Sequence, residues 1–187
     1  MYTPGGSSNS ERASSLVTVF GGARVLADSP LYARCVTLGR LLAEAGYDVA
    51  TGGYTGTMEA VLRGAAEAGA HTIGYTCATF ARDFQPNGWV QEERLTPNLT
   101  SRIQRMVDES DAFVVVHGGL GTLAELTLVW NMFLAGEARP RPLLVLGPEW
   151  RRVLDRLYQE TQLGSSAMRL LTLVDDVHAV PRALALH

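Results

Sequence analysis

Short apolar runs alternate with longer amphipathic stretches along most of the chain. The apolar runs are rich in valine and leucine and end at glycine or polar residues, which is typical of buried β-strands. The amphipathic stretches repeat apolar residues every three or four positions, which predicts helices. The predicted strands are 16–20, 47–51, 71–75, 112–116, 142–146 and 170–174. The predicted helices are 30–45, 58–68, 98–108, 122–134 and 150–163, followed by a C-terminal helix that contains Asp176 and Pro181.

Strands that alternate with helices predict an α/β fold in which a doubly wound, Rossmann-like parallel sheet is flanked by helices. We expect a single nucleotide-binding domain over residues 16–187, preceded by a disordered N-terminal tail at 1–15, a polar start without the features of a signal peptide. Residues 76–97 interrupt the alternation with prolines and an Asn-Gly pair. They predict a long loop with a short strand at 89–95, and loops of this length are often functional.

The composition narrows the class of protein. Of the 187 residues, 47% are hydrophobic and 19% charged, with a formal net charge of −3. This favours a globular, non-membrane protein and disfavours binding to nucleic acid, which requires excess positive charge. Cys35 and Cys77 lack the spacing of a metal site, so we expect reduced thiols, a cytoplasmic location, no metal and no cofactor.

All sixteen basic residues are arginine, and the chain contains no lysine. A Schiff base to pyridoxal phosphate or to a carbonyl substrate therefore cannot form. The P-loop motif, which requires lysine, is also excluded.

Three loops that contain glycine follow predicted strands. We name them the first (21–24), second (52–56) and third (118–122) glycine loops. Parallel strands end at one edge of their sheet, where ligands bind. Each loop alone is explained by a tight turn, but three at one edge favour a binding crevice.

The third glycine loop leads directly into a predicted helix. Free amide groups at a helix N-terminus attract anions, and glycine lets a phosphate approach the backbone. We therefore predict a phosphate site at Gly118, Gly119, Gly121 and Thr122. The pattern GxGxxG is absent, which favours a mononucleotide over a dinucleotide.

Two charged residues are candidates for chemistry beside this loop. Glu125 follows it on the helix, although Thr122 to Glu125 also has the spacing of a capping box. Arg102 lies near the start of the helix 98–108, although a solvated arginine on a helix face is the alternative. That helix starts at the carboxyl edge of the strands, so we expect Arg102 and Glu125 to converge.

The stretch HGGLGTLAE at 117–125 resembles the signature PGGxGTxxE of the LOG ("Lonely Guy") family, often described as lysine decarboxylase-like. The similarity extends to VFGGAR, to SPLYARCVTLGRLLAEAGYDVATGG and to TGTMEAVLRGA, so it covers most of 16–135. Members are Rossmann-like and usually dimeric. Many release the base from a nucleoside 5′-monophosphate, best known for cytokinin riboside monophosphates.

The resemblance implies that the third glycine loop holds the phosphate and that Arg102 and Glu125 carry the catalysis. A carboxylate suits cleavage of an N-glycosidic bond, because it can stabilise oxocarbenium character at the sugar and activate water. Further nucleotide contacts are expected in the same crevice from Gly22, Gly52, Gly53, Thr55 and Met58, with Tyr54 beside them.

The sequence departs from the family pattern at several positions, so the substrate stays open. His117 replaces the motif proline and either contacts the ligand or is simply accommodated at a strand end. Ile103 replaces a lysine, and Ala124 replaces a frequent glutamate. Glu59 is a weaker candidate for binding the ribose hydroxyls.

Two other functions remain as alternatives to the hydrolase. One is a non-catalytic nucleotide or molybdenum-cofactor carrier of the same fold, which has no evident need of Arg102 and Glu125. The other is single-stranded DNA binding by a DprA-type fold, which requires interleaved basic and aromatic residues that are not found. Apolar residues on several faces of 125–135 are explained by core packing together with a contact in a homodimer or a higher homo-oligomer.

Overall fold

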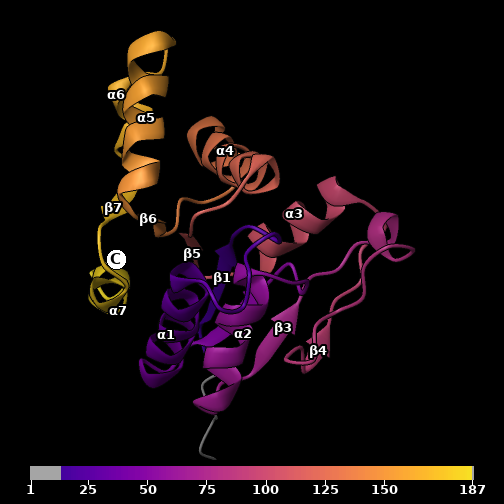
Figure 1. Cartoon of the computed structure of the whole chain (residues 1–187). Coiled ribbons are helices and arrows are strands. Elements are labelled where there is room, and N and C mark those ends of the chain that lie inside the picture. The colour runs from indigo at the N-terminus through magenta and orange to yellow at the C-terminus, as the bar shows by residue number, and fades with distance from the viewer. Residues whose placement is uncertain (1–13, 187) are drawn as a thin grey trace, which may run out of the picture.

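The computed structural model describes residues 14–186, whose arrangement is shown in Figure 1. All but the last two residues of the predicted tail lie outside this range. Within it, one sheet has seven strands in the order β4-β3-β2-β1-β5-β6-β7, and every pairing is parallel. The strands are β1 (Leu16–Phe20), β2 (Asp48–Thr51), β3 (Thr72–Gly74), β4 (Glu92–Glu93), β5 (Ala112–Val115), β6 (Leu143–Leu146) and β7 (Thr172–Val174). The strand order reverses between β1 and β5, which confirms the doubly wound fold.

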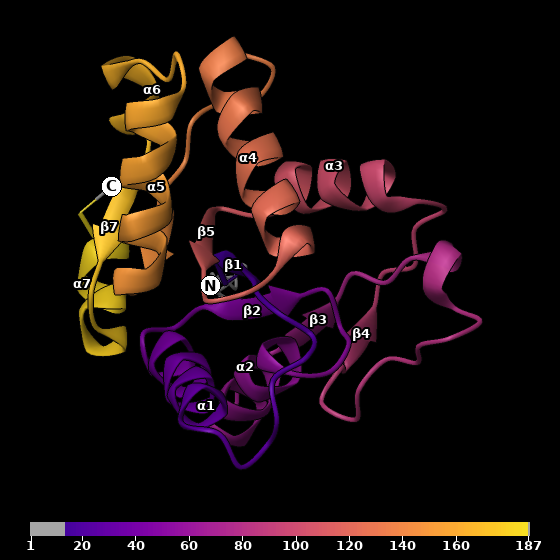
Figure 2. The ribbon, with the colours of Figure 1, turned by 45° about the horizontal axis from the view of Figure 1, so that its top comes forward.

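Helices cover both faces of the sheet (Figures 1 and 2). They are α1 (Pro30–Glu44), α2 (Thr57–Glu67), α3 (Leu99–Glu109), α4 (Leu120–Ala135), α5 (Pro148–Glu160), α6 (Ser165–Met168) and α7 (Val180–Leu184), with 3-10 turns η1 (Ala78–Phe80) and η2 (Val177–Ala179). Helices α1, α2 and α7 pack on one face, and α3 to α6 on the other. No helix in the described part is both long and apolar enough to cross a membrane.

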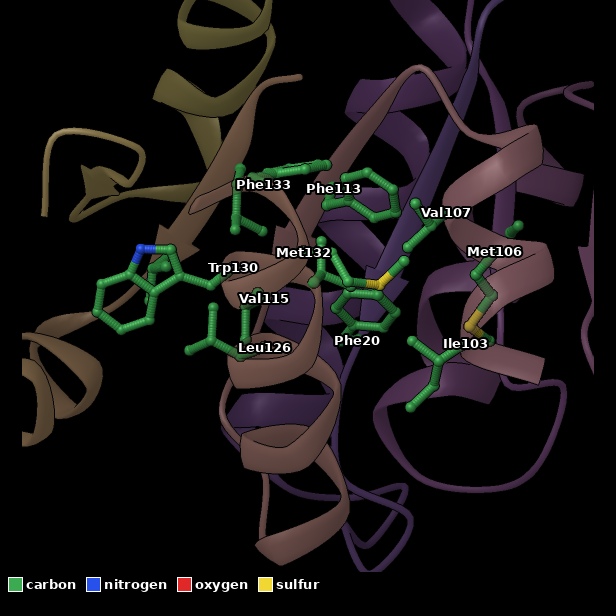
Figure 3. Packing of buried hydrophobic residues seen from close by; sticks show 14 of the residues in the cluster. Phe20, Ile103, Met106, Val107, Phe113, Val115, Leu126, Trp130, Met132 and Phe133 are labelled. Carbon is green, nitrogen blue, oxygen red and sulfur yellow. The ribbon is translucent and has the colours of Figure 1, made fainter. Parts of the chain in front are cut away.

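Alternate residues of each strand supply the two cores. Val17 and Val19 of β1 face α1 and α2, whereas Phe20 faces α3 and α4. In the core between the sheet and helices α3 to α6, the ring centroids of Phe20 and Phe113 lie 5.7 Å apart and the two rings are stacked. The ring centroid of Phe113 lies 6.0 Å from that of Phe133 of α4 (Figure 3). These contacts fix the C-terminal half of α4 on the sheet and thereby place its N-terminal half at the carboxyl edge.

Several predicted boundaries were wrong. Helix α4 begins at Leu120 rather than at Thr122, with Gly119 as its N-cap. Helix α5 ends at Glu160, and a separate short α6 follows it. Asp176 is not inside the last helix, because its carboxylate caps η2 by accepting from the His178 N–H at 3.0 Å.

The long segment 76–97 contains two small elements. The short strand expected at 89–95 is β4, which pairs with β3. An isolated parallel bridge joins Cys77 to Thr96. Both ends of the segment are thus held at the edge of the sheet, through the pairing of β4 with β3 and through the bridge between Cys77 and Thr96.

Candidate active site

The three glycine loops meet at the carboxyl edge of the sheet, as the sequence predicts. The Gly22 N–H donates to the His117 carbonyl at 3.4 Å, which joins the first loop to the start of the third. The Gly22 carbonyl accepts from the Thr57 N–H at 2.9 Å, and the Thr55 hydroxyl donates to the Ala23 carbonyl at 3.0 Å. These bonds tie the second loop to the first, so the loops form one continuous surface.

The glycines of the third loop serve two different purposes. Gly118 is required by packing, because a Cβ there would lie 2.1 Å from the Thr122 hydroxyl. At Gly119 and Gly121 a Cβ would meet nothing within 4 Å, and neither has positive φ. No contact within the described residues therefore requires glycine at those two positions, and the backbone there is open to close approach.

The N-terminus of α4 is open to an anion. No side chain caps it, and its first intrahelical hydrogen bond runs from the Leu123 N–H to the Gly119 carbonyl at 3.0 Å. The amides of the preceding turn have no helical acceptor and lie at the positive end of the helix dipole. The capping-box alternative for Glu125 is wrong, because that residue lies beyond the N3 position of the helix.

Arg102 of α3 and Glu125 of α4 are in direct contact. The Nη2 of Arg102 lies 3.0 Å from the Oε1 of Glu125, and their side chains are only 6% and 13% exposed. The alternative of a solvated surface arginine is therefore wrong. Within residues 14–186, the Nε of Arg102 is the one buried side-chain nitrogen or oxygen without a hydrogen-bond partner.

The second glycine loop shapes the space around this guanidinium. A Cβ on Gly52 would lie 2.2 Å from Nη2 of Arg102 and 2.7 Å from the sulfur of Met58, so a larger residue would displace these side chains. The Cζ of Arg102 lies 5.8 Å from the ring centroid of Tyr54, in cation-π geometry. Gly52, Tyr54 and Met58 thus position Arg102 as one unit.

Burial controls the charge of Glu125. Loss of solvation raises the pKa of this carboxyl group to about 7, and the neighbouring Arg102 guanidinium lowers the pKa only in part. Near neutral pH the group is therefore present in both protonation states. A carboxyl group poised in this way suits proton transfer.

Three other predicted residues make contacts with partners other than Arg102 and Glu125. The Gly53 carbonyl accepts from the Asn87 side chain at 3.0 Å. Glu59 faces α1, where it accepts from the Tyr32 hydroxyl at 3.3 Å. His117 is exposed and lines a separate cavity of about 260 Å³ between α1 and the ends of β5 to β7.

Four residues near the site were not predicted. Phe80, Phe84 and Asn87 come from the 76–97 segment and contact Tyr54. The aromatic spacing of four in FARDF was the available signal for the two phenylalanines. The Trp150 indole N–H donates to the Val116 carbonyl at 3.0 Å and fixes the strand end before the third loop, a contact with no local sequence signal.

The fold and the site together define a Rossmann-like α/β protein in which a glycine loop and an uncapped helix N-terminus lie beside a buried arginine-glutamate pair. The chain belongs to the family described as "Possible lysine decarboxylase", whose model matches residues 58–184, and the predicted LOG resemblance is thereby confirmed.

Individual relatives support the same grouping. The chain is 31% identical over 170 residues to the cytokinin riboside 5′-monophosphate phosphoribohydrolase of Mycobacterium tuberculosis (strain ATCC 25618 / H37Rv), covering 85% of this chain and 90% of that protein. It is 30% identical over 186 residues to the pyrimidine/purine nucleotide 5′-monophosphate nucleosidase of Escherichia coli (strain K12), with 92% of this chain covered. The match spans only 40% of that nucleosidase.

The fold is shared with solved structures. The molybdenum cofactor binding protein of Rippkaea orientalis superposes with a TM-score of 0.73 at 21% identity, covering 94% of this chain and 98% of that one. At this identity the likeness establishes the fold alone.

Proposed function

We propose that the chain is a hydrolase that cleaves the N-glycosidic bond of a nucleoside 5′-monophosphate, of the AMP or cytokinin riboside monophosphate type. The products are the free base and ribose 5-phosphate. The observation that carries this proposal is the buried contact between Arg102 and Glu125 at 3.0 Å beside an uncapped helix N-terminus. The names of the relatives from M. tuberculosis and E. coli support the same class of reaction.

The residues divide the work of binding and chemistry. The third glycine loop and Thr122 hold the phosphate through backbone amides and a hydroxyl. Gly22, Thr55 and Met58 complete the crevice. Arg102 donates to the substrate while it orients Glu125 through their hydrogen bond.

The reaction balances with water as the only co-reactant. As the bond between C1′ and the base nitrogen breaks, its electron pair leaves with the base and positive charge develops on the sugar. The Glu125 carboxylate stabilises this charge and takes a proton from the attacking water, whose oxygen bonds to C1′. The proton is then returned to the base, and the carboxylate is restored.

The carrier alternative explains less of the site. A carrier would use the phosphate loop, but it gives no reason to bury a carboxyl group against an arginine, an arrangement that is costly without a role. Decarboxylation of lysine through pyridoxal phosphate is also disfavoured, because the chain has no lysine to form the Schiff base.

The assembly and location that we propose follow from other features. Leu120, Leu128 and Leu134 of α4 are 83%, 37% and 48% exposed, and Ala124 and Asn131 lie exposed between them at helical spacing. An exposed stripe that is apolar except at Asn131 suits a homodimer contact. Cys35 and Cys77 are free and buried, which suits a cytoplasmic location.

A panel of nucleotides tests the proposed function. The purified chain is incubated with purine, pyrimidine and N6-modified adenine 5′-monophosphates, and free base is separated by chromatography. Release of base in step with ribose 5-phosphate is the expected result. Binding of nucleotides without release of any base would replace the hydrolase with the carrier, and absence of binding would rule out both.

A further inference from the structure

The segment between β3 and β4 folds over the second glycine loop and is tied to it at both ends. Figure 2 shows the segment in magenta, leaving β3 and returning to β4. At its start, the Cys77 N–H donates to the Tyr54 hydroxyl at 2.9 Å. At its end, the Asn87 side-chain amide donates to the carbonyls of Gly53 at 3.0 Å and Tyr54 at 2.7 Å. The residues between are thus held beside the candidate active site.

Three aromatic side chains meet in this arrangement, and we call Tyr54, Phe80 and Phe84 the aromatic wall. The ring centroids of Phe80 and Phe84 each lie 6.0 Å from that of Tyr54, and they lie 6.2 Å from each other. Tyr54 in turn lies against Arg102. The wall therefore extends outward from the buried ionic pair.

Core packing does not account for the wall. None of its three rings belongs to either of the hydrophobic clusters that the described residues form on the two faces of the sheet. Tyr54 is only 6% exposed, but Phe84 leaves 50% of its surface exposed. A large aromatic ring that is held by two ring contacts and is half exposed is available to a ligand.

The contacts run in the same order as the groups of a nucleotide. The third glycine loop leads along α4 to Glu125, Glu125 contacts Arg102, and Arg102 lies against Tyr54. A nucleoside 5′-monophosphate presents its phosphate, its ribose and its base in that order. A base whose phosphate occupies the loop and whose C1′ lies at the pair would point toward the wall.

We propose that Phe84 stacks on the base of the nucleotide and favours purine over pyrimidine nucleotides, with Tyr54 and Phe80 holding its ring in place. This inference rests on the proposed function, since it requires a nucleotide in the crevice. Stacking recognises the face of a base rather than its hydrogen-bonding edge, so every base is accepted. Purine nucleotides bind more tightly than pyrimidine nucleotides because their rings offer more area.

Two ligands that differ only in the base test the inference. The affinities of AMP and of ribose 5-phosphate are measured by calorimetry on the full chain carrying Glu125→Gln, so that AMP is not hydrolysed during the titration, with and without Phe84→Ala. The substitution is expected to weaken AMP binding at least about fivefold, the lower end of measured base-stacking effects. Binding of ribose 5-phosphate, which has no base, stays unchanged.

Further variants separate stacking from packing. Phe84→Leu keeps an apolar side chain and is expected to lose most of the AMP affinity that Phe84→Ala loses. Tyr158→Ala removes an aromatic ring that is 47% exposed on α5 and leaves both affinities unchanged. Equal weakening of both ligands by Phe84→Ala, or unchanged AMP affinity, would overturn the stacking role while the hydrolase stands. If the unchanged chain binds neither ligand, the proposed function itself fails and the inference fails with it.

Discussion

Arg102 and Glu125, twenty-three positions apart along the chain, meet at 3.0 Å between α3 and α4. Both side chains are almost fully withdrawn from solvent. Burial favours the neutral form of the carboxyl group and the guanidinium favours the charged form, and burial has the larger effect. The contact therefore holds a carboxyl group whose charge can change near neutral pH at the place where the glycine loops meet.

Replacement of this carboxyl group separates binding from turnover. Glu125→Gln keeps the shape of the side chain but can neither stabilise positive charge nor accept a proton. We expect kcat for base release to fall by about a hundredfold or more, while AMP affinity measured by calorimetry changes little. Glu160→Gln, at a carboxylate that is 70% exposed on α5, serves as the control and keeps full turnover. Retained turnover in Glu125→Gln would remove this residue from the mechanism.

The pH dependence of turnover reports the same group. The raised pKa means that Glu125 is mostly protonated below about 7 and mostly ionised above it. The mechanism uses the ionised form, so kcat is expected to rise as pH increases through 7 and then to level off. Initial rates of base release between pH 5 and pH 9 measure the profile. A rate that instead falls through this range would assign Glu125 the role of a general acid.

Periodicity predicted the fold because the central strands β1 and β5 are buried on both faces. The runs LVTVF and AFVVV are apolar at nearly every position since alternate side chains supply the cores on opposite sides of the sheet. Helix ends were harder to predict. Thr122 has the sequence features of an N-cap, but Gly119 is the N-cap residue of α4. Where this helix begins depends on how the third glycine loop packs against Gly22.

The residues of the site were predictable where they depend on topology, whereas in the irregular segment 76–97 a functional loop was predicted but its contacting residues were not. The start of α3 and the glycine loops share an edge in any doubly wound sheet, which is why Arg102 could be placed beside Glu125. The positions of Phe80 and Phe84 depend instead on Asn87 and on the hydroxyl of Tyr54. Those contacts join two loops, and loops have no periodic pattern of hydrophobic residues from which such contacts could be predicted.

The fit of Gly52 against the guanidinium predicts a positioning effect. A Cβ in Gly52→Ala would lie 2.2 Å from Nη2 and displace Arg102 from Glu125. Since Arg102 lowers the pKa of Glu125, its displacement raises that pKa further. We expect kcat to fall at least about tenfold and the pH profile to shift toward higher pH. Gly88→Ala, where a Cβ meets nothing within 4 Å, is the matched control. A lower rate with an unshifted profile would contradict the positioning role.

The apolar stripe on α4 predicts how the chain assembles. Light scattering after size exclusion is expected to give about twice the chain mass of 20.2 kDa. Leu128→Arg introduces a charge on the stripe that the dimer would have to bury, so it should give the monomer. Leu95→Arg, at a side chain that is 57% exposed on the β4 side, leaves the mass unchanged. A monomeric unchanged chain would show that the stripe has another use.

The open space at Gly121 predicts that stability and binding change in opposite directions. In Gly121→Ala the new methyl group meets no atom within 4 Å, and the residue lies in the first turn of α4. Alanine favours the helix over glycine by about 0.5–1 kcal/mol, so the melting temperature should rise slightly. The same methyl group keeps a phosphate away from the amides, so the affinity for ribose 5-phosphate should fall about tenfold, comparable to the loss of one charge-assisted hydrogen bond. Thermal melting and calorimetry on the same preparation measure both effects. If the affinity stays unchanged while the stability rises, the anion does not approach α4 at this turn, and the phosphate site would have to lie nearer Gly22.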